Sequence, residues 1–196
     1  MSKLILVRHA APATDACVAP NQWPLSDDGR QSCRALARVL APYWPAALVS
    51  SREAKAAETA AFVARELGAR YTTAAGLQEH ARSSVGWLSQ PEYETGIAAL
   101  FARPDEAIFG DESADQAYER FRAAVTGVLD QHLDENVAIV THGTVLTLFV
   151  AHGQPGLEPL AFWQGLGLPS VAVLSRPGLV LEQLIDKVEA NGNQVG

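Results

Sequence analysis

Residues 3–9 read Lys-Leu-Ile-Leu-Val-Arg-His, and this stretch decides the fold class. After the first lysine it is wholly apolar up to Arg8, with no alternation of polar and apolar side chains. Such a run predicts a strand buried on both faces, which is typical of a parallel sheet covered by helices. A second buried run, Asn136 to Thr141, also ends at a histidine, His142. We therefore expect one sheet whose strands deliver polar residues to a common edge.

Amphipathic helices alternate with these strands. Ser26 precedes two aspartates and predicts the start of a helix that ends near Pro42. Further helices are expected over 54–67, 90–102, from 113 onward, and over 143–153. Further strands are expected over 47–50, weakly near 70–73, and over 170–175, the last paired with 179–181. This order predicts an α/β fold, a three-layer αβα sandwich with a mostly parallel central sheet.

The length and the middle of the chain set the domain organisation. With 196 residues the chain suits a single domain over 1–196, since domains average roughly 150 residues. Residues 76–112 contain no expected strand, and a capping-box pattern at Ser89 opens a helix within them. We therefore expect a small helical insertion over about 76–112, and a frayed tail over 189–196.

Composition excludes several classes of protein. The net charge of −7 argues against a nucleic-acid-binding surface, and no apolar run reaches the roughly 18 residues of a membrane helix. The cysteines, Cys17 and Cys33, form no CxxC pair, which favours a reducing cytoplasm. No nucleotide-binding loop or metal-ligand spacing is present, so neither a cofactor nor a metal is expected. The sequence leaves the oligomeric state open.

Cationic and imidazole side chains follow the predicted strands where these end. Arg8 and His9 follow the first strand, Arg52 and Lys55 follow the second, and His142 follows the strong later strand. Ligands bind outside the carboxyl ends of the strands in open α/β sheets. Arginine and lysine bind phosphate, and a histidine with one free ring nitrogen can attack phosphorus. These residue types together predict a site for a phosphorylated ligand.

The helix expected after His142 adds to this site. It opens at Gly143 and Thr144, whose backbone N–H groups at a helix N-terminus favour an anion.

Three blocks of sequence resemble one family. They are Leu4 to Ala10, Ser50 to Ala60, and Val140 to Gly143, in this order along the chain. Together they resemble the histidine phosphatase superfamily, in its phosphoglycerate-mutase-like branch, over roughly residues 3–175.

The resemblance implies a role for each matching residue. His9 is implied as the phosphorylated nucleophile, with Arg8 beside it and His142 bonding the transferring phosphoryl oxygens. Glu79, which precedes most of the helical insertion, resembles the family's general acid. The insertion over about 76–112 is implied to be a cap over the pocket.

The sequence departs from the family's pattern at two positions. The family motif usually reads Arg-His-Gly, and Ala10 stands at the glycine position, which is tolerable where φ is negative. The family's second phosphate-binding arginine is replaced by Lys55, which supplies a point charge in place of a bidentate fork. Lys55 is our first choice for the second cation, and Arg52 is the alternative.

The expected function is a metal-independent phosphomonoesterase that forms a phosphohistidine intermediate on a small phosphorylated metabolite. A phosphate-ligand-binding protein without catalysis is an alternative, because the second cation is a lysine and the general acid is implied only by the resemblance. A phosphoglycerate-type mutase is another, although the chain is short for one. A protein phosphohistidine phosphatase is a narrower option.

Overall fold

The computed structural model describes residues 2–44 and 46–190 of the chain. Its strands are β1 Lys3–Arg8, β2 Ala46–Ser50, β3 Thr72–Thr73, β4 Asn136–Thr141, β5 Ser170–Ser175 and β6 Leu181–Ile185. Its α-helices are α1 Asp27–Leu40, α2 Ala54–Glu66, α3 Gln90–Ala102, α4 Ala114–Gln131, α5 Gly143–Gly153 and α6 Pro159–Gly165. Two short 3-10 helices, η1 Pro20–Gln22 and η2 Ala41–Tyr43, complete the elements.

The strands form one sheet in the order β3-β2-β4-β1-β5-β6. The pairs β3–β2, β2–β4 and β4–β1 are parallel, whereas β1–β5 and β5–β6 are antiparallel. The expected mostly parallel sheet is therefore confirmed. The two strands that end at histidines, β1 and β4, are direct neighbours, and Arg8 is in register with Thr141.

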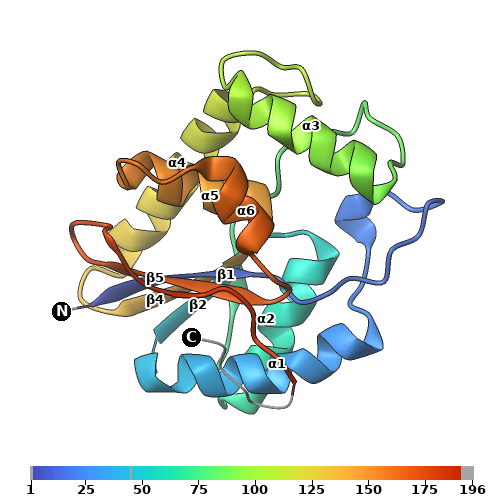
Figure 1. Cartoon of the computed structure of the whole chain (residues 1–196). Helices are drawn as coiled ribbons and strands as arrows, with labels where there is room; N and C mark the ends of the chain where they lie inside the picture. Colours follow the sequence, from blue (N-terminus) through green and yellow to red (C-terminus); the bar gives the residue numbers. More distant parts are fainter. Residues whose placement is uncertain (1, 45, 191–196) are drawn as a thin grey trace.

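Helices cover both faces of the sheet, as Figure 1 shows: α1 and α2 lie on one side, and α4, α5 and α6 on the other. Successive side chains of β1 point to opposite faces of the sheet, so this strand packs against both helix layers. Leu4 and Leu6 pack into the core beneath α4 and α5, while Ile5 and Val7 pack against α1 and α2. Each face is apolar because each meets a helix layer, so the three-layer sandwich expected from the sequence is confirmed.

Three helices, α1, α3 and α4, start at the expected capping serines. The Ser26 hydroxyl accepts the N–H of Gly29 at 3.0 Å at the start of α1. Ser113 and Gln116 form a reciprocal capping box at the start of α4. At α3 the Glu92 carboxylate accepts the Ser89 N–H at 2.8 Å. These caps satisfy backbone donors that a helix leaves free at its N-terminus.

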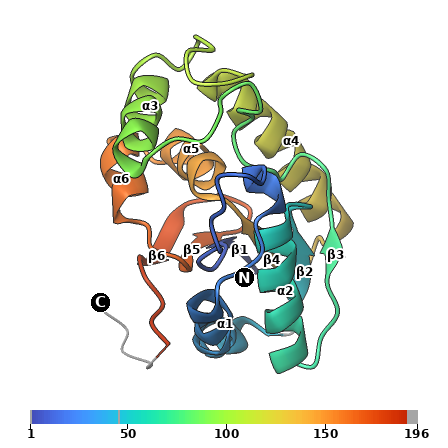
Figure 2. The same ribbon diagram turned by 90° about the vertical axis from the view of Figure 1, so that its right-hand side faces the viewer.

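Segment 76–112 contains no strand and one α-helix, α3. Figure 2 shows α3 lying beside α6, on the α4–α6 side of the sheet. Apolar contacts hold it there, because Ile97, Leu100 and Phe109 bury themselves against Trp163 of α6. Segment 76–112 is thus fixed to the rest of the protein through a helix from the C-terminal third of the chain.

Several details differ from the sequence-based expectation. Helix α6 was not expected, because its seven residues are too few to show a periodicity. The last strand was expected over 179–181, but β6 runs over Leu181–Ile185, because residues 176–180 form the turn that leads into it. The tail expected to fray, 189–196, lies outside the described residues from 191 onward. Among the helices that the structure describes, none has the length and apolarity to cross a membrane.

Candidate active site

His9 directly follows β1 and is held by two backbone contacts. Its N–H donates to the Thr141 carbonyl at 3.0 Å, and its Nδ1 lies 2.7 Å from the Ala10 carbonyl oxygen. A carbonyl oxygen only accepts, so Nδ1 carries the proton and Nε2 keeps its lone pair. Leu179 is the only non-glycine residue with positive φ in the described ranges, so Ala10 is unstrained at the family's glycine position. His9 therefore presents a defined tautomer.

His142 stands at the N-cap of α5, directly after β4, and is fully buried. Its ring centroid lies 5.2 Å from that of His9, with the two rings in an edge-to-face arrangement. Its Nε2 is 2.9 Å from the Ser51 hydroxyl, and its buried Nδ1 has no hydrogen-bond partner within residues 2–44 and 46–190. The structure thus places side by side two imidazoles that are 133 positions apart in the sequence.

Burial keeps both imidazoles uncharged. It lowers the pKa of His9 well below 6.5, and the neighbouring His142, Lys55 and Arg8 lower it further. Burial likewise lowers the pKa of His142, followed by the charges of Lys55, Arg8 and Arg120. At neutral pH both rings are therefore neutral, the state in which an imidazole nitrogen can act as a nucleophile.

Arg8 is positioned by α5 and α6. Its Nη1 donates to the Leu166 carbonyl at 2.5 Å, and its guanidinium lies 5.9 Å from the ring centroid of Trp163. A Cβ at Gly143 would lie 2.9 Å from its Nε, so only glycine permits this approach. Burial lowers the pKa of Arg8, partly offset by Tyr93 and Glu79. Its buried Nε has no hydrogen-bond partner among the described residues.

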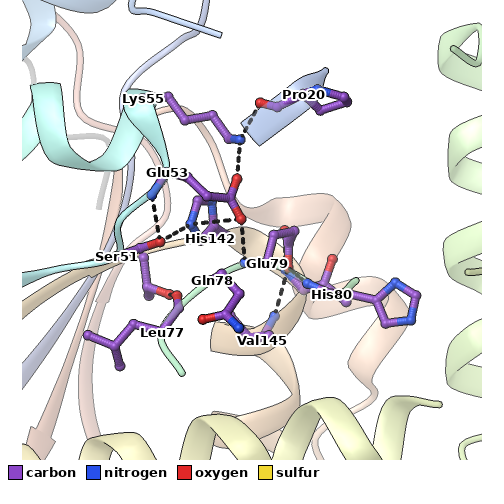
Figure 3. A network of polar contacts seen from close by, with 12 residues as sticks. Pro20, Ser51, Glu53, Lys55, Leu77, Gln78, Glu79, His80, His142 and Val145 are labelled. Carbon is purple, nitrogen blue, oxygen red and sulfur yellow. Dashed lines mark hydrogen bonds and ion pairs between the residues drawn. The ribbon is translucent and has the colours of Figure 1, made fainter. Parts of the chain in front are cut away.

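The two candidates for the second cation differ sharply in position. Lys55 is buried in the first turn of α2, with its ammonium bonded to Glu53 and to the Pro20 carbonyl (Figure 3). Arg52 is exposed and makes no hydrogen bond or ion pair to other described residues. The structure therefore brings Lys55, and not Arg52, into the buried network.

Glu79 reaches the N-terminus of α5. Its carboxylate accepts the backbone N–H groups of Thr144 at 3.1 Å and Val145 at 3.2 Å. A negative charge is stabilised at this end of a helix. The Thr144 N–H, which we had expected to bind phosphate, is thus already bonded to Glu79. Gly143 instead makes room for Arg8.

The loop that carries Glu79 is held from α4. Arg120 donates to the carbonyl oxygens of Gly76, Gln78 and Glu79 and forms an ion pair with Glu112 at 2.6 Å. The loop begins at Gly76 with φ of +86°, where a Cβ would also meet α4.

Four residues of this network were missed by sequence reasoning: Glu53, Tyr93, Arg120 and Trp163. Glu53 lies within the Ser50–Ala60 block, and an acidic residue two positions before the expected cation was the one available signal. The other three come from α3, α4 and α6, and only tertiary packing brings them here. In the described part of the chain, no cluster of three or more His, Cys, Asp or Glu side chains could hold a metal ion.

The sequence model of the histidine phosphatase superfamily (branch 1) matches residues 4–177. The chain belongs to this family. The matched region includes every residue of the site described above. No curated protein sequence matches the chain.

Solved structures share the fold at low sequence identity. YhfR from Bacillus stearothermophilus superposes with a TM-score of 0.75 at 22% identity, covering 97% of this chain and 99% of its own. A mutant phosphoserine phosphatase from Entamoeba histolytica, bound to phosphoserine, superposes with a TM-score of 0.74 at 17% sequence identity. The match covers 97% of this chain and 99% of that one. The mycobacterial glucosyl-3-phosphoglycerate phosphatase bound to VO3 superposes with a TM-score of 0.72 at 23% sequence identity. The match covers 96% of this chain and 100% of that one. The phosphoglycerate-mutase-like fold inferred from the sequence is confirmed.

Proposed function

We propose that the chain is a phosphatase that hydrolyses a small phosphate monoester through a phosphohistidine on His9. One observation carries this proposal: the His9 Nδ1–H is bonded to the Ala10 carbonyl, which leaves a neutral Nε2 beside His142 and Arg8. Family membership and the phosphatases among the similar structures support the same reaction class. The reaction proposed needs no metal or cofactor.

The proposed reaction has two steps. The Nε2 of His9 attacks phosphorus, so that a P–N bond forms while the P–O bond to the leaving alcohol breaks. Arg8 and His142 stabilise charge on the phosphoryl oxygens, and Glu79, protonated in the complex with substrate, gives its proton to the leaving oxygen. Water then attacks phosphorus, so that a P–O bond forms while the P–N bond breaks, and the water proton returns to the Glu79 carboxylate. This step releases inorganic phosphate and restores both His9 and the acid. We propose segment 76–112 as the cap that covers this site.

Replacing the nucleophile is the first test. We expect His9→Ala to abolish phosphate release from p-nitrophenyl phosphate and to remove the acid-labile phosphorylation of the protein. His152→Ala is the matched control, because His152 is exposed on α5 and stacks only on Tyr118. It should retain full activity. Turnover by His9→Ala at the wild-type rate would refute the mechanism.

The role of Glu79 calls for a separate experiment. Loss of a general acid matters most when the leaving group is a poor one, since a good leaving group departs without a proton. We expect Glu79→Gln to slow hydrolysis of an alkyl phosphate by roughly 100-fold, and that of p-nitrophenyl phosphate much less. An equal loss of rate on both substrates would mean that Glu79 stabilises the N-terminus of α5 and does not transfer a proton.

A binding protein without catalysis is the second candidate. The pairing of Lys55 with Glu53, and of the Thr144 N–H with Glu79, favours this alternative, because both groups are engaged without a ligand. Binding of phosphate or vanadate by the wild type, with no turnover across a panel of phosphorylated metabolites, would establish it.

A further inference from the structure

The ammonium group of Lys55 is engaged on two sides. Its Nζ donates to Glu53 Oε2 at 2.5 Å and to the Pro20 carbonyl at 2.8 Å, as Figure 3 shows. The side chains of Lys55 and Glu53 are only 8% and 12% exposed, so water screens this ion pair weakly. A lysine has three N–H donors, which leaves one for a ligand.

Glu53 joins this cation to the rest of the site. Its other oxygen, Oε1, accepts the backbone N–H of Glu79 at 2.9 Å. The same oxygen lies 3.7 Å from Nε2 of His142. One carboxylate therefore contacts Lys55 and also reaches Glu79 and His142, two residues to which the proposed function assigns roles (Figure 3).

Glu53 offsets part of the positive charge of the site. Arg8 and Lys55 are positive, the Glu53 carboxylate is paired with Lys55, and the lowered pKa values of His9 and His142 keep both rings neutral. A phosphate monoester carries close to two negative charges at neutral pH. Such a dianion gains less from this site than it would from the two cations without Glu53, because the carboxylate repels it at short range.

We propose that Glu53 masks Lys55, so that a phosphoryl group binds by replacing Glu53 as the partner of the lysine ammonium. The inference rests on the proposed function, because it concerns the affinity of that same site for phosphate. A phosphoryl oxygen and a carboxylate oxygen offer an ammonium the same kind of charged acceptor. The masking sets a modest affinity for inorganic phosphate, the product, and thereby favours its release after turnover.

Removing the charge of Glu53 while keeping its shape is the direct test. Glu53→Gln retains an oxygen that can accept the Glu79 N–H. We expect it to bind inorganic phosphate roughly tenfold more tightly than wild type in calorimetry, and to be inhibited by phosphate at correspondingly lower concentration. Glu119→Gln is the matched control, because it removes the same charge from an exposed carboxylate paired only with Arg122. Its phosphate Kd should equal that of wild type.

A second substitution separates masking from a general effect of charge. Lys55→Met should cost little phosphate affinity in the wild type, where the lysine is masked, and at least several-fold more in the Glu53→Gln background, where it is free. Equal losses in both backgrounds would overturn the proposal, as would unchanged or weaker phosphate binding by Glu53→Gln.

A crystal structure of the wild type with vanadate tests the proposal without any variant, and so applies even if the variants fold poorly. We expect Lys55 Nζ to bond a vanadate oxygen and to have left Glu53; an intact Lys55–Glu53 pair beside bound vanadate would refute the masking. A wild type that binds neither phosphate nor vanadate would overturn the proposed function as well. Phosphate binding by the wild type without tighter binding by Glu53→Gln would overturn this inference alone.

Discussion

At the scale of single residues, the site depends on two histidines that the fold keeps uncharged. Neither His9 nor His142 has a carboxylate within hydrogen-bond distance, and the nearest is Glu53, 3.7 Å from His142. Burial and two nearby cations therefore outweigh anything that would stabilise an imidazolium. This arrangement preserves the lone pair on Nε2 of His9 that the proposed function uses, but it also makes the fold sensitive to acid.

The pH dependence of stability tests this state of the histidines. Below about pH 6.5 the unfolded chain takes up protons on His9 and His142 that the folded protein does not bind, because both pKa values are lowered on folding. The free energy of unfolding should therefore fall with falling pH in this range, by up to about 1.4 kcal/mol per pH unit for each histidine. Above this range the two rings contribute no pH dependence.

Urea unfolding at pH 7.5 and 5.5 measures the effect. A His9→Gln, His142→Gln double variant should lose less stability between these two pH values than wild type does. Equal losses would show that the two histidines titrate normally in the folded protein. Carboxylates contribute to both proteins alike, so the difference isolates the imidazoles.

Some residues of the site could be predicted from the sequence, and others could not. Arg8, His9, Lys55 and His142 could be predicted, because each follows a buried strand and the carboxyl ends of parallel strands share an edge. Glu53 could not, because its side-chain direction depends on where the loop carrying Glu79 passes. An acidic residue near a cation is more often solvated than buried in an ion pair.

At the scale of secondary-structure elements, α4 controls a loop that it does not adjoin in sequence. Arg120 is 41 positions from Glu79, yet its guanidinium bonds the Glu79 carbonyl at 3.1 Å. The same side chain holds Glu112, which in turn accepts the Ala81 N–H at 2.9 Å. A planar fork of five donors is suited to several carbonyl oxygens at once. Helix α4 thus fixes both ends of the turn that presents Glu79.

We expect Arg120→Met to lower kcat by roughly 10- to 100-fold with little change in KM, because Arg120 holds the loop of Glu79 and a small displacement of this proposed acid is costly. The loss should be larger for an alkyl phosphate than for p-nitrophenyl phosphate, as for Glu79→Gln. Arg122→Met is the matched control on the same helix, since Arg122 is exposed and pairs only with Glu119.

The leaving-group comparison distinguishes positioning from mere destabilisation. Assays well below the melting temperature of each variant keep both proteins folded. If Arg120→Met slows the two substrates equally, Arg120 supports the fold and does not act through Glu79.

At the scale of the whole molecule, the sheet and its two helix layers could be predicted, but the attachment of segment 76–112 could not. Apolar runs and helical periodicity are local signals, so β1, β4 and α1 could all be recognised from the sequence. The contacts of α3 with α6 join residues such as Ile97 and Trp163 that are far apart in the sequence. Helix α3 is not strongly amphipathic over its length, and α6 has only seven residues. Their pairing depends on tertiary packing, which no local pattern encodes.

Trp163 makes this attachment part of the site. Its ring is 5% exposed, packs with Ile97 and Phe109, and lies 5.8 Å from the Tyr93 ring centroid. The guanidinium of Arg8 lies 5.9 Å from the Trp163 ring centroid and also bonds the Leu166 carbonyl just beyond α6. One side chain therefore links segment 76–112 to Arg8, the arginine that we propose binds phosphate.

Truncating Trp163 should then weaken the fold and the site together. We expect Trp163→Ala to lower the free energy of unfolding by about 3–5 kcal/mol, as for other buried aromatic residues, and to raise the phosphate Kd because Arg8 loses its neighbour. Trp163→Phe keeps a ring in place and should retain most of both properties. Trp87→Phe is the control, since Trp87 is 59% exposed. Urea unfolding measures the change in stability, and phosphate titration measures the change in Kd. A destabilised Trp163→Ala protein with the wild-type phosphate Kd would mean that α6 anchors segment 76–112 without setting the position of Arg8.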